Sequence, residues 1–149
     1  MKQAKQIVKF RAIVRILGDE KDKFIKQLNH LNQIIHTKTQ SVQRIIDYKN
    51  DYRNGKNIKS CLEVPTLIIN MDLFIAKLDE AIYQERSNIE CCGKEREACL
   101  LKIKLVEDKI DAIEKKMSQI GKKLKVMEME LESNELDELT VQSRMRQER

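Results

Sequence analysis

The sequence predicts an all-α fold in which two long helices form an antiparallel coiled coil, as a single domain over residues 1–149. Three observations lead to this prediction. The charged fraction is 36%, above the roughly 25% of ordinary globular chains. Aromatic residues make up only 4% of the chain, and four glycines and one proline are too few turn formers for a multistranded sheet. The apolar residues also recur with heptad spacing over most of the chain.

The first helix is expected over about residues 3–53. One heptad register runs through this segment, and eleven of its fourteen a and d positions are apolar. The exceptions are Lys21, Lys38 and Lys49. Gly18 disfavours a helix by about 1 kcal/mol, but the heptad phase is the same on both sides of it, so the helix is expected to continue. The a and d positions are Ile7, Phe10, Val14, Leu17, Lys21, Phe24, Leu28, Leu31, Ile35, Lys38, Val42, Ile45, Lys49 and Tyr52.

A connection is expected over about residues 54–66, because Asn54 and Gly55 are typical of a turn and Pro65 suits the first turn of a helix. A connection of this length allows the two helices to run antiparallel. The second helix is therefore expected from about 66 to 140, followed by a tail over about 141–149.

The second helix carries its own heptad register, in which fifteen of seventeen a and d positions are apolar. The exceptions are Glu85 and Arg96. Over both helices 26 of 31 positions are apolar, whereas a composition that is 41% apolar predicts about 13. The positions are Ile75, Leu78, Ile82, Glu85, Ile89, Cys92, Arg96, Cys99, Ile103, Val106, Ile110, Ile113, Met117, Ile120, Leu124, Met127 and Leu131.

The two expected helices differ in length, which predicts an unpartnered apolar stripe. If residue 53 lies opposite residue 66, residue 3 lies opposite about residue 116. The stripe continues beyond that point, and burial of each such side chain is worth about 1.5–3 kcal/mol, so the row is expected to be a binding surface. Self-association of the chain through the same stripe is the alternative. The residues of the stripe are Met117, Ile120, Leu124, Met127 and Leu131.

The same pairing places Lys38 within about one layer of Glu85. An ion pair between them would help to fix the register of the two helices. The alternative is that both charged groups extend to solvent.

The charge is unevenly distributed along the chain. Residues 1–60 contain 14 basic and 5 acidic residues, whereas residues 61–149 contain 15 and 19. This division suits intramolecular pairing, an acidic partner or nucleic acid. Nucleic acid is disfavoured, because the heptads begin at Ile7, within the basic stretch. In basic-zipper proteins the basic region and the heptads are separate segments.

No motif for catalysis or for binding a metal or cofactor is present, so the chain is not expected to be an enzyme. The four cysteines contain no CxxC pair. His30 and His36 fall outside the a and d positions, which form the seam between the two helices. Cys92 and Cys99 are expected to be small core residues. The sequence has no membrane-spanning apolar run and no signal peptide, which predicts a soluble intracellular protein. The cysteines are Cys61, Cys91, Cys92 and Cys99.

Three stretches resemble the FliJ family, the small coiled-coil proteins of the bacterial flagellar type III export apparatus. Residues 45–54, Ile-Ile-Asp-Tyr-Lys-Asn-Asp-Tyr-Arg-Asn, are similar to an acidic, tyrosine-containing segment of the family. Residues 74–82, Phe-Ile-Ala-Lys-Leu-Asp-Glu-Ala-Ile, resemble the segment after its loop. Residues 132–139, Glu-Ser-Asn-Glu-Leu-Asp-Glu-Leu, with Arg144 and Arg146 following, look like its terminal Asp-Glu motif.

This resemblance implies a central stalk of the export apparatus. Family members form an antiparallel hairpin similar to the γ subunit of rotary ATP synthase, insert the end that carries the termini into the hexameric export ATPase (FliI-like), and promote its assembly. They also contact the export gate protein (FlhA-like) and export chaperones. The resemblance therefore implies a cytoplasmic protein, peripheral to the inner membrane and not inserted in it. A stalk protein of an injectisome secretion system is the nearest alternative.

The resemblance also implies two sets of binding residues. The gate contact maps to Phe74, Leu78 and Ala81. For Phe74 and Leu78 the alternative is packing between the two helices near the hairpin end. The ATPase contact coincides with the unpartnered stripe, so its expected residues are Leu124, Met127, Leu131, Leu136, Asp137, Glu138, Leu139, Arg144 and Arg146.

Overall fold

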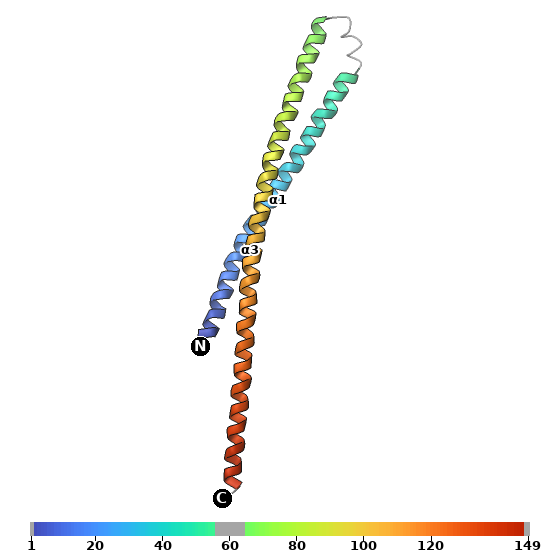
Figure 1. Ribbon diagram of the computed structural model, residues 1–149. Coiled ribbons are helices and arrows are strands. Elements are labelled where there is room, and N and C mark those ends of the chain that lie inside the picture. Colours follow the sequence, from blue (N-terminus) through green and yellow to red (C-terminus); the bar gives the residue numbers. More distant parts are fainter. Residues whose placement is uncertain (1, 56–64, 148–149) are drawn as a thin grey trace. The chain divides into compact units, whose positions relative to one another are not determined.

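A computed structural model describes residues 2–55 and 65–147 of the chain (Figure 1). Two helices, α1 (Lys2–Asn54) and α3 (Pro65–Gln147), pack against each other as an all-α hairpin, and these residues contain no strand. The predicted fold class is therefore confirmed. Most of the predicted connection, residues 56–64, lies outside the described residues.

At the hairpin end the helix boundaries agree with the predicted turn residues and with Pro65. Helix α1 ends at Asn54, and Pro65 begins α3, where its missing N–H has no intrahelical partner to lose. Helix α3 continues to Gln147, so the predicted end at about residue 140 is wrong. No glycine or proline follows Gly121, and the Thr140 hydroxyl donates a 2.8 Å hydrogen bond to the Leu136 carbonyl within the continuing helix.

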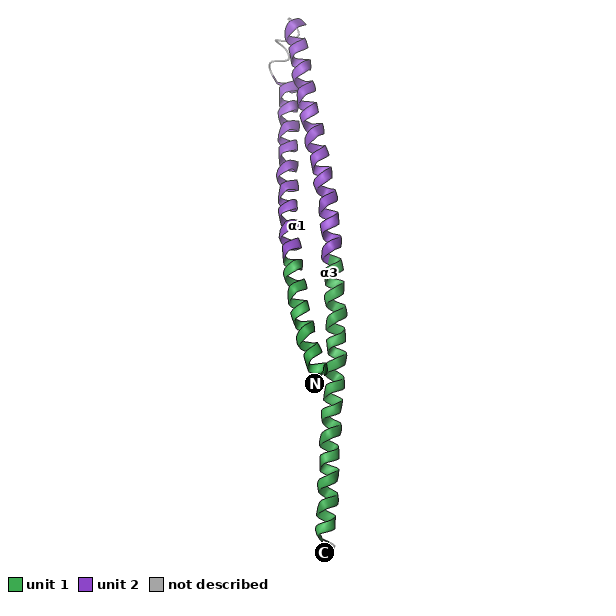
Figure 2. Ribbon diagram, turned by 90° about the vertical axis from the view of Figure 1, so that its left-hand side faces the viewer, with its two compact units in different colours: residues 1–22, 104–149 green, residues 23–103 purple. Residues whose placement is uncertain are grey.

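The chain divides into two compact units, and each helix contributes to both (Figure 2). Unit 1 consists of residues 1–22 and 104–149, and unit 2 of residues 23–103.

Unit 2 contains most of the buried side chains, all of them at predicted a or d positions. Leu31, Cys99 and Ile103 form a cluster, against which Phe24, Ile25 and Leu28 pack. The Cys99 thiol lies 3.1 Å from the Phe24 carbonyl and donates to it. The buried residues of this unit are Leu31, Val42, Ile75, Ile82, Cys99 and Ile103.

In unit 1 the side chains at the a and d positions are less completely buried. Val106 is buried, and the Lys116 ammonium lies 5.9 Å from the centre of the Phe10 ring. Helix α1 passes through Gly18 without interruption, as predicted. The half-buried seam residues of α3 in this unit are Ile110, Ile113, Met117, Ile120 and Leu124.

The observed register differs from the predicted one by about one heptad. Phe10 lies against Lys116, whereas the predicted pairing placed residue 3 opposite about residue 116. Met117, Ile120 and Leu124 are consequently half-buried, and the prediction that they are unpartnered is wrong. Every residue from 125 to 147 is exposed, so the unpartnered part of α3 begins later than expected. We refer to residues 125–147 as the overhang.

Each of the three seam lysines of α1 forms an ion pair with α3. In unit 1, Lys21 Nζ lies 3.1 Å from Glu107 Oε1. In unit 2, Lys38 Nζ lies 3.4 Å from Glu85 Oε2, and Lys49 pairs with Asp79. The predicted Lys38–Glu85 ion pair is therefore present, with both side chains about 30% exposed.

We predict that Glu85→Gln lowers the free energy of unfolding by about 0.5–1 kcal/mol, because it leaves a half-buried ammonium without its counter-charge. The same substitution should cost almost nothing in a Lys38→Met background, where that ammonium is absent. Urea unfolding followed by circular dichroism measures all four proteins of the cycle. Glu95→Gln, at an exposed site, is the matched control. Equal effects of Glu85→Gln in the two backgrounds would show that the pair adds no stability.

Candidate functional site

The overhang carries large apolar side chains on its exposed surface. Met127 is 49% exposed, Leu131 61%, Leu136 64% and Leu139 62%. Met127 and Leu131 occupy the last d and a positions of the predicted register, and they are its only exposed members. The seam therefore continues past the start of α1, and its apolar residues are available to another molecule. The exposed large apolar residues of the overhang are Val126, Met127, Met129, Leu131, Leu136, Leu139, Val141 and Met145.

The overhang is also strongly acidic. Residues 128–138 contain six carboxylates and no basic residue. Arg144 and Arg146 follow in the last turn of the helix. Asp137, Glu138, Arg144 and Arg146, the charged residues expected to contact the ATPase, are all exposed. A partner of this segment must offer apolar surface together with positive charge.

A groove of about 690 Å³ lies where the overhang meets the first turns of α1. On the α1 side it is lined by Lys2, Gln3 and Gln6. On the α3 side Leu124, Met127 and Leu131 line it, together with Glu128, Glu130 and Asn134. Leu124, Met127 and Leu131 are three of the expected contact residues, and the structure brings them together in one groove.

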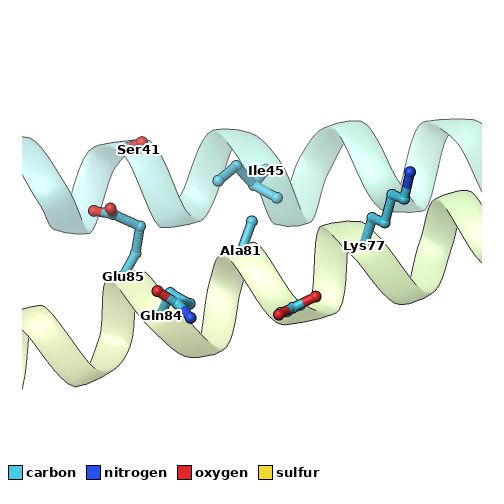
Figure 3. A pocket seen from close by; sticks show the side chains of 7 residues that line it. Ser41, Ile45, Lys77, Ala81, Gln84 and Glu85 are labelled. Atoms are coloured by element: carbon cyan, nitrogen blue, oxygen red, sulfur yellow. The ribbon is translucent and has the colours of Figure 1, made fainter.

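A second hollow, of about 460 Å³, lies along the seam of unit 2 (Figure 3). Ser41 and Ala81 are small side chains on the two helices, so the seam is less filled here. Ala81, an expected gate residue, is thus accessible in a hollow bordered by charged groups. The lining residues are Ser41, Ile45, Lys77, Glu80, Ala81, Gln84 and Glu85.

The other two expected gate residues are engaged within unit 2. The Phe74 ring lies 4.9 Å from the Tyr52 ring and 6.2 Å from the Tyr48 ring, measured between centroids. Leu78 is half-buried at its d position. Both side chains therefore contribute to helix packing in this structure.

The resemblance did not identify three exposed residues on the same stretch of α3. Ile69 and Leu73 are each 58% exposed, and Tyr83 is 75% exposed. They fall at b and f positions, on the face of α3 opposite the seam. Apolar residues that are out of phase with the a and d positions are the sequence signal for such a second face.

The histidines and cysteines form no site in the described part of the chain. No cluster of three or more potential metal ligands occurs there. Cys99 is buried and Cys92 half-buried, as predicted for core residues, whereas Cys91 is exposed. Cys61 lies outside the described residues. Within the described helices no segment is long and apolar enough to cross a membrane.

Comparison of the chain with models of known protein families, with curated proteins and with solved structures gave no match. The overhang with its groove, and the surface around Ala81, are therefore the features from which a function is inferred.

We predict that Phe74→Ala lowers the free energy of unfolding by about 1–2 kcal/mol, because it removes ring packing across the two helices. Tyr83→Ala, on the exposed face of the same helix, should change it by less than about 0.5 kcal/mol. Thermal unfolding measured by circular dichroism compares the two. Equal stability of the Phe74→Ala protein and the unsubstituted protein would contradict the packing role of Phe74.

Proposed function

We propose that the protein is the central stalk of a bacterial flagellar type III export apparatus, a non-enzymatic component that binds the export ATPase ring and promotes its assembly. It acts in the cytoplasm at the inner membrane, and it also contacts the export gate and export chaperones. The observation that carries the proposal is the overhang, which presents exposed apolar and charged side chains on an unpartnered helix.

The overhang suits insertion into a ring of subunits. Its eight exposed large apolar residues are distributed around the circumference of the single helix, so they can contact apolar surfaces on several sides. A stalk that binds the assembled ring more tightly than the separate subunits stabilises the ring by mass action. The overhang also contains the residues 132–139 that resemble the family's terminal motif.

The gate contact is proposed for the hollow beside Ala81 and for the exposed face formed by Ile69, Leu73 and Tyr83. Phe74 and Leu78 support this surface from within by their packing between the helices. A partner can therefore contact this region without separating α1 from α3.

The test is ATPase turnover measured against enzyme concentration, with the flagellar export ATPase of the same organism. The full chain should raise turnover at low enzyme concentration, because it favours the assembled ring. A truncation ending at Lys125 keeps the packed seam but lacks most of the overhang, and should have no effect. Leu136→Ser/Leu139→Ser should raise the concentration needed for half-maximal stimulation at least roughly tenfold.

Leu101→Ser/Leu105→Ser is the matched control, because these leucines are 59% and 52% exposed but lie outside the overhang. This control should stimulate turnover like the unsubstituted chain. Stimulation by the Lys125 truncation, or none by the full chain, would exclude the proposed action of the overhang.

A further inference from the structure

Positive and negative charge are sharply separated within unit 1. Residues 2–18 of α1 contain five basic residues and no acidic one. The stretch 115–125 of α3 packs beside this part of α1, and it contains five lysines and no acidic residue. The next part of the same helix, 128–138, contains six acidic residues and no basic one. A basic two-helix segment is thus followed directly by an acidic single helix.

The basic segment also has exposed apolar side chains on the outer side of α1. Val8 and Ile16 are each 65% exposed. With Ala4 and Ala12 they form a row at intervals of four residues, which places all four on one side of the helix. The basic segment and the overhang therefore each combine uncovered apolar area with charge, and their charges are opposite.

The two segments match when two copies of the chain are placed antiparallel. Aligning Ser133, the centre of the acidic stretch, with Ile120 of the second copy, the centre of the lysine stretch, brings Asp137 level with Lys116. In the hairpin Lys116 lies over Phe10, so Asp137 also comes level with Arg11 of the second copy. The same alignment places Arg146 level with Glu107. The acidic stretch thus meets the lysine stretch, and Arg146 meets an acidic residue, whereas Arg144 comes level with Lys109.

In this alignment each copy makes the same contacts with the other copy, so the pair has twofold symmetry. Its twofold axis passes between Val126 and Met127, beside the groove at the start of α1. Each overhang then covers the basic segment of the other copy, and the contact closes at two chains. Pairing the two overhangs with each other would instead place acidic stretches side by side, which is electrostatically unfavourable.

We propose that the occupant of this surface is a second copy of the chain, docked antiparallel so that the acidic stretch 128–138 of each copy lies on residues 2–18 and 115–125 of the other. The dimer covers the overhang that the proposed function assigns to the ATPase ring, so ring binding and dimerisation exclude each other. That consequence rests on the proposed function. The dimer itself is tested without the ATPase, so the two proposals can fail separately.

The test is the mass of the chain by sedimentation equilibrium, over a range of concentrations and at two salt concentrations. The unsubstituted chain should pass from 17.6 kDa to twice this mass as its concentration rises. Because charge pairs hold the partners, the dissociation constant should rise at least roughly tenfold at high salt. Lys9→Glu/Arg11→Glu and Glu135→Lys/Asp137→Lys should each be monomeric at concentrations where the unsubstituted chain is a dimer.

An equimolar mixture of the two charge-reversed proteins should regain the dimer mass, since the substituted positions of each copy then meet opposite charge on the other. Lys26→Glu/Arg44→Glu changes the charge equally at exposed sites in unit 2, and should dimerise like the unsubstituted chain. Circular dichroism confirms that each variant is helical. A chain that stays monomeric, a charge-reversed protein that dimerises alone, or a mixture that stays monomeric would each overturn the proposal.

Discussion

Ion pairs join the seam lysines of α1 to acidic residues of α3, and they favour one axial offset of the two helices over the others. An apolar heptad seam fixes which faces of two helices meet, but sliding one helix by seven residues leaves those faces in contact. The charged residues at a and d positions distinguish between offsets that differ by seven residues. At the observed offset Lys21, Lys38 and Lys49 each reach a carboxylate. At the offset one heptad away, Leu100 and Leu78 would take the places of Glu107 and Glu85, so Lys21 and Lys38 would lose their partners. Asp72 would take the place of Asp79, so Lys49 alone would keep a carboxylate.

The offset determines which part of α3 is left without a partner. Because Phe10 lies against Lys116, Met117, Ile120 and Leu124 are covered by the first turns of α1. The overhang begins only after them. Its exposed leucines and its carboxylates are therefore a consequence of pairing inside the hairpin, and not of any local property of residues 125–147. The same offset brings the basic first turns of α1 beside the lysine stretch 115–125 of α3, next to the acidic stretch.

The sequence predicted the two helices and the seam because heptad spacing depends only on local periodicity. All fourteen predicted positions of α1 are at least half-buried, and in α3 the only exposed ones are Met127 and Leu131. The axial offset was not predictable in the same way, since it depends on how the connection closes. The roles of Phe74 and Leu78 were equally ambiguous, because an apolar residue near a seam can pack or bind. Their contacts with the rest of unit 2 became evident only in the folded arrangement.

Helix α3 is unpartnered from about residue 125, and this can be measured by amide hydrogen exchange along the helix. The measurement is made at a concentration at which the chain is monomeric. Helices without a packed face are marginal in water, so amides up to Leu124 should be protected and those of 125–147 should exchange much faster. A loss of protection already at Lys116 would support the offset expected from the sequence, in which residue 3 lies opposite about residue 116. Full protection to Gln147 would contradict the account, because it would mean that another part of the chain covers the overhang.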